Sequence, residues 1–442
     1  MSSGAYEDVT DHLARVLKGA GAEAWADLDG HVRGVIRWGD HVPPPGAWLS
    51  AAPGRRPTAL ELALALCGPD GRTREAALPY VTHTPALLPL LVIRCADWAE
   101  PVRERARELL RAELPGLSPE ALAAVAAVVL RETRRLRGES AYDLLTARLR
   151  EAPEVHVLAL CAGEDRAVRR LAHRVVVDRA LLSPARLASI AATDPDVVVQ
   201  DLCASAAITA AGDTVDETVL VPLLGSRTGR VRAAGVTALR RTGRAAEAEL
   251  FLYDRSVLVR ACARWTLRQT GTDPLPLYRA ACAAGDRTPD FAAVGLGECG
   301  DRAADAPALW ALIAHERPRV RAGAVAGLRL LDAVRLQRLV PLLDDSSPRV
   351  VRETAKALAP WADHFPADAL SRVPGDAPAD AEADAEAVVA EAVAEAPAEA
   401  PADVPIRAPG GVTAPEPRSW ARRVLRVLRL VRWRNRSRSA AT

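Results

Sequence analysis

The stretch DRSVLVR, residues 254–260, decides the fold because similar segments recur along the chain. Most copies have Asp or Ser within their first three positions and end with Val-Arg. The clear copies are DWAEPVR (97–103), GEDRAVR (163–169), DPDVVVQ (194–200), SRTGRVR (226–232), HERPRVR (315–321) and SSPRVVR (346–352), with weaker ones at 68–74 and 286–292. Nine steps from Arg74 to Arg352 average about 31 residues, the length of a two-helix unit.

Each copy has the features of a helix start. Asp or Ser at its beginning can accept a hydrogen bond from a backbone N–H of the first turn, and Pro is tolerated there. After the copy at 226–232, Ala234 and Ala238 continue from Val231 at helical spacing and give one apolar face. The segment ETVLVPLLGS (217–226) precedes it as a partner helix. Because one such hairpin cannot bury both of its faces, neighbouring hairpins must stack.

The composition agrees with a helical repeat. Hydrophobic residues make up 49% of the chain but aromatic residues only 4%, so the core is built from Ala, Leu and Val, which favour helices as a set. The D-x-x-x-x-V-R element, followed by Ala and Leu at helical spacing, resembles the HEAT-repeat family in its short bacterial, phycobilisome-lyase-like form. The resemblance covers about residues 60–360. It implies an all-α, right-handed α-solenoid of about nine to ten HEAT-type hairpins, a fold that mostly serves as a protein-binding scaffold.

Four regions follow from the pattern. Residues 1–57 hold an amphipathic segment and a Pro-rich break, which predict an N-terminal helical cap on the first repeat. Residues 58–372 form the solenoid. Residues 373–417 form an Ala/Glu/Pro-rich acidic linker, which is expected to be disordered because it has too little apolar surface to bury. Residues 418–442 form an Arg-rich amphipathic helix and tail. The acidic part of the linker, 374–406, holds nine acidic residues and no basic one.

The C-terminal segment RSWARRVLRVLRLVRWRNRSRS (418–439) offers the most specific functional signal. As a helix it would place Val and Leu on one side and arginines on much of the other. Its candidate membrane- or polyanion-binding residues are Trp420, Arg422, Arg423, Arg426, Arg429, Arg432, Trp433, Arg434 and Arg436. The apolar stripe and the two tryptophans favour an anionic membrane surface. The RWRNRSRS end favours nucleic acid, and a protein groove, including the solenoid's own concave face or the acidic linker, is the third alternative.

Charged residues recur once per repeat and form a predicted structural ladder. Its members are Asp97, Arg103, Arg169, Asp194, Arg232, Asp254, Arg260, Arg321 and Arg352. One interpretation is a track for an anionic partner. The other, which the HEAT resemblance favours, is that each arginine pairs with the capping Asp of its own or the neighbouring repeat. Gln200 and Ala292 interrupt the row, which argues against a continuous phosphate track.

Motifs for enzyme chemistry are weak. His315-Glu316 resembles one of the repeated His-Glu pairs with which deoxyhypusine hydroxylase binds iron, but a single pair cannot complete a metal site, and we expect His315 at a helix start. HEAT-like DNA glycosylases gather aromatic residues in a groove. Here Trp98, Trp265 and Trp310 fall at different places in their repeats, so they are expected to pack between repeats. The sequence contains no P-loop, nucleophile elbow or zinc-ligand spacing.

The sequence therefore predicts a non-enzymatic scaffold without cofactor or metal, binding an unidentified protein along its concave face. The tail would associate the scaffold with an anionic membrane surface or regulate it. The alternative is a nucleic-acid-associated HEAT protein that uses the Arg-rich tail as its polyanion anchor. Seven scattered cysteines without a C-x-x-C pair, and the absence of a signal peptide or long apolar run, indicate the cytoplasm, with peripheral attachment at the inner membrane face.

Overall fold

A computed structural model describes residues 4–364, except residue 20 and the ranges 39–44, 52–54 and 134–136. Within these ranges every regular element is helical, which confirms the all-α class. The predictions for the linker and for the Arg-rich tail, including the binding residues from Trp420 to Arg436, lie outside the described residues.

Ten consecutive pairs of helical segments occupy the described chain between Ala59 and Leu358, within the predicted number of hairpins. In chain order they are α4/α5, α6/α7, α8/α9, α10/α11, α12/α13, α14/α15, η4/α16, α17/α18, α19/α20 and α21–η6/α22. The chain divides into two compact units, residues 1–183 with 195–203 and residues 184–194 with 204–442. Helix α13 (Val197–Ala211) contributes to both units.

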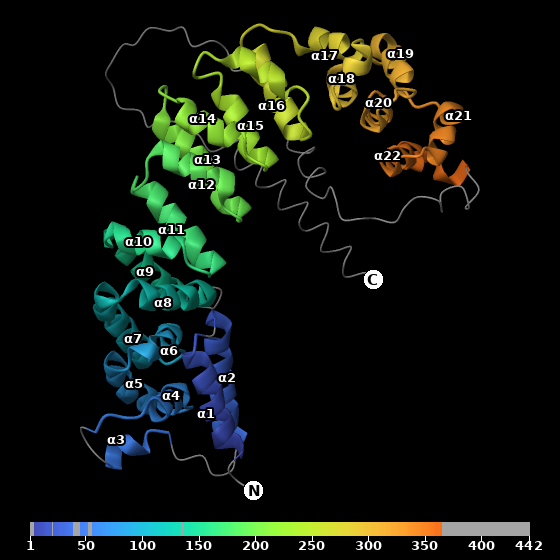
Figure 1. Cartoon of the computed structure of the whole chain (residues 1–442). Helices are drawn as coiled ribbons and strands as arrows, with labels where there is room; N and C mark the ends of the chain where they lie inside the picture. Colours follow the sequence, from blue (N-terminus) through green and yellow to red (C-terminus); the bar gives the residue numbers. More distant parts are fainter. Residues whose placement is uncertain (1–3, 20, 39–44, 52–54, 134–136, 365–442) are drawn as a thin grey trace, which may run out of the picture. The chain divides into compact units, whose positions relative to one another are not determined.

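The first unit is a double row of helices. Its elements are α1 (Gly4–Leu17), α2 (Ala22–Trp38), α3 (Ala47–Ala51), α4 (Ala59–Cys67), α5 (Gly71–Ala77), η1 (Leu78–His83), η2 (Pro85–Leu87), α6 (Leu88–Arg94), α7 (Glu100–Glu113), η3 (Leu114–Gly116), α8 (Pro119–Glu132), α9 (Glu139–Glu151), α10 (Glu154–Cys161) and α11 (Arg166–Asp178). Helices α4, α6, α8 and α10 form one row, and α5, α7, α9 and α11 form the other. Helix α2 contacts α4, α6 and α8, so the N-terminal segment extends along three hairpins (Figure 1).

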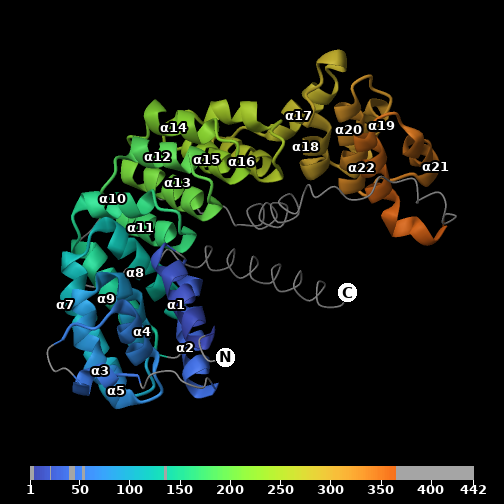
Figure 2. The ribbon, with the colours of Figure 1, turned by 60° about the horizontal axis from the view of Figure 1, so that its bottom comes forward.

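The second unit continues the same construction. Its elements are α12 (Pro184–Thr193), α14 (Glu217–Leu224), α15 (Gly229–Ala238), η4 (Ala245–Phe251), α16 (Val257–Arg268), α17 (Pro274–Cys282), η5 (Gly285–Arg287), α18 (Ala292–Cys299), α19 (Arg302–Leu312), α20 (Pro318–Leu330), α21 (Leu336–Leu339), η6 (Val340–Asp344), α22 (Pro348–Leu358) and η7 (Ala359–His364). Helices α18, α20 and α22 pack in sequence, as Figure 2 shows.

Glycines allow a close contact between two helices of this unit. A Cβ at Gly297 on α18 would lie 2.5 Å from the Cα of Gly327 on α20. Such an approach is open only to residues without a side chain.

The described helices bury Ala, Leu and Val, as the composition predicts. The seven cysteines form no disulfide with one another, and five are buried among these side chains, where they serve as small apolar residues. None of the helices in the described ranges has the length and apolarity to span a bilayer.

Candidate functional site

One arginine position recurs in the second helix of six hairpins, four residues after the N-cap. Arg74, Arg103, Arg169, Arg232, Arg260 and Arg321 hold this position. In five of them the Nη1 donates to the backbone carbonyl six residues earlier, in the turn between the two helices. These Nη1-to-oxygen distances lie between 2.7 and 3.0 Å, with Gly68, Asp97, Ser226, Asp254 and His315 as acceptors. Each such guanidinium therefore closes its own hairpin turn.

Three of these arginines, Arg74, Arg232 and Arg321, also reach an aspartate of the next hairpin through a two-pronged salt bridge. Arg232 donates to both carboxylate oxygens of Asp254 at 2.8 and 2.6 Å, and Arg321 binds Asp345 at 2.9 and 2.8 Å. Both acceptors stand two residues before the cap of the following helix, and Asp254 also accepts the N–H of Ser256. Since paired guanidinium–carboxylate bonds fix orientation as well as distance, the ladder sets the stacking of one hairpin on the next.

Arg260 binds a different kind of acceptor from the three ladder arginines that reach an aspartate of the next hairpin. Two residues before the cap of α18, where the hairpins that accept those three arginines have Asp, this chain has Pro289, and Arg260 instead binds Glu298 on α18. Arg264 donates to the same carboxylate at 2.5 Å, and all three charged side chains are nearly buried. Tyr278 lies beside them and donates to a backbone carbonyl. These contacts join α16 to α18, and no sequence pattern indicates Glu298 as the acceptor.

Two other positions depart from the predicted register. Asp196, two residues after the predicted Asp194, accepts from Arg166 and Arg170 at 3.0 and 2.5 Å. The hydrogen bond from Arg170 lowers the pKa of the Asp196 carboxyl. Arg352 lies one residue beyond the ladder position, because α22 is capped by Ser347 and Val351 stands fourth after that cap. The aligned Val-Arg pair therefore places the last copy one residue out of register.

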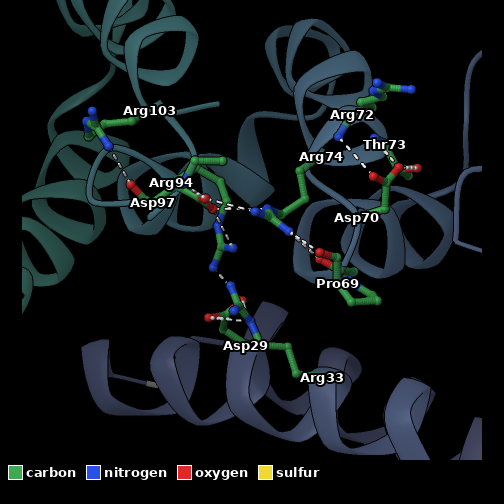
Figure 3. A network of polar contacts seen from close by, with 12 residues as sticks. Asp29, Arg33, Pro69, Asp70, Arg72, Thr73, Arg74, Arg94, Asp97 and Arg103 are labelled. Atoms are coloured by element: carbon green, nitrogen blue, oxygen red, sulfur yellow. Dashed lines mark hydrogen bonds and ion pairs between the residues drawn. The ribbon is translucent and has the colours of Figure 1, made fainter. Parts of the chain in front are cut away.

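The first unit contains a buried charged network, shown in Figure 3. Arg74 on α5 binds Asp97 at 3.0 and 2.9 Å, Arg94 on α6 binds the same carboxylate at 3.1 Å, and Arg94 also binds Asp29 on α2 at 2.5 Å. The side chains of Arg74 and Asp97 are fully buried. Burial opposes ionisation of Asp29, but the charges of Arg94 and Arg33 together with hydrogen bonds from Arg94 and Cys67 outweigh it and lower the pKa of that carboxyl. The network joins α2 to two hairpins.

A different arrangement occurs at α19 and α21 in the second unit, which we call the Trp310 groove. It has a volume of about 750 Å³ and is lined by Asp301, Arg302, Ala303, Ala306, Pro307, Trp310, Ala311, Ala333, Val334, Arg335 and Arg338. The Arg338 guanidinium carbon lies 4.3 Å from the Trp310 ring centroid, and that of Arg335 lies 6.0 Å away. Both arginines are exposed, whereas Trp310 is only 6% exposed beneath them.

The groove arginines differ from the ladder arginines in their partners. Arg335 and Arg338 form no ion pair with any residue in the described part of the chain, and both stack on an aromatic ring. At the rim, Arg302 is paired with Asp332 at 3.0 Å, and that pair is exposed. Guanidinium groups held over a ring keep donors available for a carboxylate or phosphate. The groove can therefore receive an anionic ligand with a small apolar side.

Other predicted site residues have structural surroundings. His315 accepts the N–H of Arg317 at 3.0 Å, which confirms its place at a helix start. Trp310 packs between helices as expected, but Trp98 is 65% exposed, so its predicted packing role is wrong. It stands just before α7 and contacts only the edge of the network, 5.4 Å from the Arg74 guanidinium carbon. In the described ranges no three His, Cys, Asp or Glu side chains gather as metal ligands.

The Trp310 groove was missed from the sequence. The spacing of Arg335 and Arg338, three residues apart, places both on one helical face and was an available signal. Their meeting with Trp310, on another helix, depends on how the two hairpins stack. A local sequence pattern does not indicate which residues of two stacked hairpins come into contact.

Comparisons with known proteins give a likeness of fold. No family model and no curated protein matches the chain. Among solved structures, the chain resembles Kap121p at 10% identity, covering 88% of this chain and 51% of that one, with a TM-score of 0.28. It also resembles the karyopherin Kap121p bound to the extreme C-terminus of the protein phosphatase Cdc14p, at 12% identity, 76% and 45% coverage and a TM-score of 0.28.

An engineered protein is similar at 17% identity, covering 80% of this chain and 98% of that one, with a TM-score of 0.21. The chain spans about half the length of the Kap121p chains. At such TM-scores these likenesses carry no argument about function. The assignment as an α-solenoid of HEAT-type hairpins rests on the ten helical pairs and their arginine ladder.

Proposed function

We propose that the protein is a non-enzymatic scaffold that binds a protein partner and that the Trp310 groove is a contact site for that partner. The observation that carries this proposal is the pair of exposed arginines on Trp310 that have no ion-pair partner in the described ranges. The ladder arginines Arg74, Arg232 and Arg321, in contrast, are engaged in salt bridges between hairpins. Aromatic and Arg side chains are enriched where protein partners bind.

The scaffold proposal is tested by affinity capture with the full chain and quantitative mass spectrometry. The groove variant Arg335→Glu/Arg338→Glu is compared with Arg329→Glu, a control at an exposed arginine on α20 of the same unit. A partner that binds the native chain and the control but is lost by the groove variant supports the role. Capture of the same proteins by all three chains would contradict it.

We further propose that the chain lies in the cytoplasm and that the Arg-rich tail, 418–442, attaches it to an anionic membrane surface. The support is in the sequence, where Trp and Leu/Val positions alternate with arginines at helical spacing. Vesicles with and without phosphatidylserine, sedimented with the full chain and with a chain lacking 415–442, test it. Loss of binding upon truncation, without loss of the body's circular dichroism, is expected. A truncated chain that still sediments would refute the membrane anchor.

The runner-up function is association with nucleic acid through the same tail, favoured by the RWRNRSRS end. It predicts binding that weakens steeply between about 50 and 200 mM salt, because phosphate contacts release counterions. A gel shift with DNA and RNA at both salt concentrations distinguishes it from vesicle binding.

We also propose that the repeats belong to the short bacterial, phycobilisome-lyase-like form of the HEAT family, because they carry the D-x-x-x-x-V-R element.

A further inference from the structure

We infer that the acidic segment 374–406 of this same chain docks in the Trp310 groove. The inference does not depend on the scaffold role, because it concerns a contact within one molecule. It assigns an occupant to a surface on the second unit and a binding site to a segment with a strongly biased composition.

The charges of the two elements are complementary. The groove presents Arg335 and Arg338, exposed and held over Trp310, with Arg302 at its rim. The segment offers nine carboxylates and no competing base. These are Asp376, Asp380, Glu382, Asp384, Glu386, Glu391, Glu395, Glu399 and Asp403. Guanidinium groups match carboxylates with two parallel hydrogen bonds, so a passing Asp or Glu completes the donors that the fold leaves open.

The sizes of the side chains are also complementary. The apolar lining consists of Ala303, Ala306, Pro307, Ala311, Ala333 and Val334. Between its acids the segment carries almost only Ala, Val and Pro. Glu391 and Glu395 are four residues apart with only Ala and Val between them, and Ala and Pro separate Glu395 from Glu399. The acidic segment therefore combines small apolar side chains with carboxylates, and the Trp310 groove combines small apolar side chains with arginines.

The covalent connection brings the segment within reach. The described chain ends at His364 in the second unit, and the nine residues 365–373 lie between it and position 374. The ten steps from residue 364 to residue 374 span up to about 33 Å when the chain is extended. Helix α22, just before this end, contacts α21, which carries Arg338. A short tether raises the effective concentration of its segment to about the millimolar range, so individually weak exposed ion pairs suffice for occupancy.

Docking has a consequence for the tail. The Arg-rich tail has the same sign of charge as the groove, so both attract the acidic segment. When the segment lies in the groove, the tail arginines stay free for an anionic target. When the segment is displaced, for example by an acidic partner, it can pair with the tail instead. The groove would thus couple partner binding to the availability of the tail.

The test is zero-length cross-linking of the full chain. A carbodiimide joins a carboxyl to an amine as an amide and takes up the released water as its urea. The chain has only two lysines, Lys18 and Lys356, so Arg338→Lys adds one identifiable amine while keeping the positive charge. Arg329→Lys adds a matched amine at an exposed site on α20. Peptide mapping by mass spectrometry then reports which carboxyls each added amine reaches.

We expect cross-links from position 338 to residues 376–403 about tenfold more often than from position 329, because docking holds these carboxyls beside position 338, whereas the tether raises the effective concentration for both positions alike. Circular dichroism checks that each variant folds. Equal yields from the two positions, or links from 338 only to Asp301 and Asp332, would overturn the inference. Links between isotopically light and heavy chains would assign the groove to a second copy and would also overturn it.

Discussion

Arg74 and Arg338 show how one residue type does two different things in this molecule. Arg74 is fully buried, binds Asp97 through two nitrogens and donates to two turn carbonyls. Arg338 is exposed and stacks on Trp310, and it forms no ion pair within the described ranges. The buried arginine holds hairpins together, and the exposed one leaves its donors open. The partner of each guanidinium, more than its charge, therefore distinguishes an arginine that stabilises the fold from one that we propose for partner binding.

The largest effect is expected at the buried end of this comparison. Asp97→Asn removes the charge that Arg74 and Arg94 share, leaving two buried guanidinium groups without full compensation. Breaking a buried pair on one side costs about 3–5 kcal/mol of unfolding free energy. Urea denaturation measures the loss, and hydrogen exchange should place it in α5, α6 and α7.

Asp332→Asn is the matched control, because its ion pair with Arg302 is exposed. Exposed pairs contribute about 0–1 kcal/mol. Asp332 has a φ of 50°, a conformation that Asn also tolerates. If Asp97→Asn costs no more than this control, the buried network does not hold the N-terminal hairpins together.

A single ladder step should have an intermediate effect. Arg321 and Asp345 are only slightly exposed, and a hydrogen bond to a charged group contributes about 1.5–3 kcal/mol. A double-mutant cycle with Arg321→Ala and Asp345→Ala should give a coupling energy of about 1–2 kcal/mol in urea denaturation. Additive single effects would mean that the two-pronged contact adds nothing to hairpin stacking.

The ladder also predicts how stability depends on pH. Hydrogen bonds from Arg170 and Arg321 lower the pKa values of Asp196 and Asp345, respectively. A carboxyl whose folded pKa is depressed stabilises the protein above its unfolded pKa of about 3.9, and that contribution disappears as pH falls through the folded value. Unfolding free energy should therefore drop below about pH 4. Asp345→Asn should flatten this part of the curve, and an unchanged slope would refute the assignment.

The sequence predicts the fold because its repeat records helix starts and apolar faces, both of which are local properties. Asp254 and Arg232 could be placed in one ladder because their spacing repeats in register. Glu298 as partner of Arg260 could not, because it lies inside a helix that the weak copy at 286–292 obscures. The Trp310 groove could not be predicted for a related reason, because its tryptophan and arginines come into contact only through the stacking of two hairpins.

The smallest effect on stability is expected at the exposed end of the comparison. Arg338→Ala removes an exposed stacking contact with Trp310, which contributes about 0.5–1 kcal/mol. The double variant Arg335→Ala/Arg338→Ala should nevertheless abolish capture of a groove partner, because both guanidinium donors are lost. Urea denaturation and affinity capture on the same samples separate the two effects. A large loss of stability would instead make Arg338 a structural residue like Arg74, and the distinction between paired and unpaired arginines would fail.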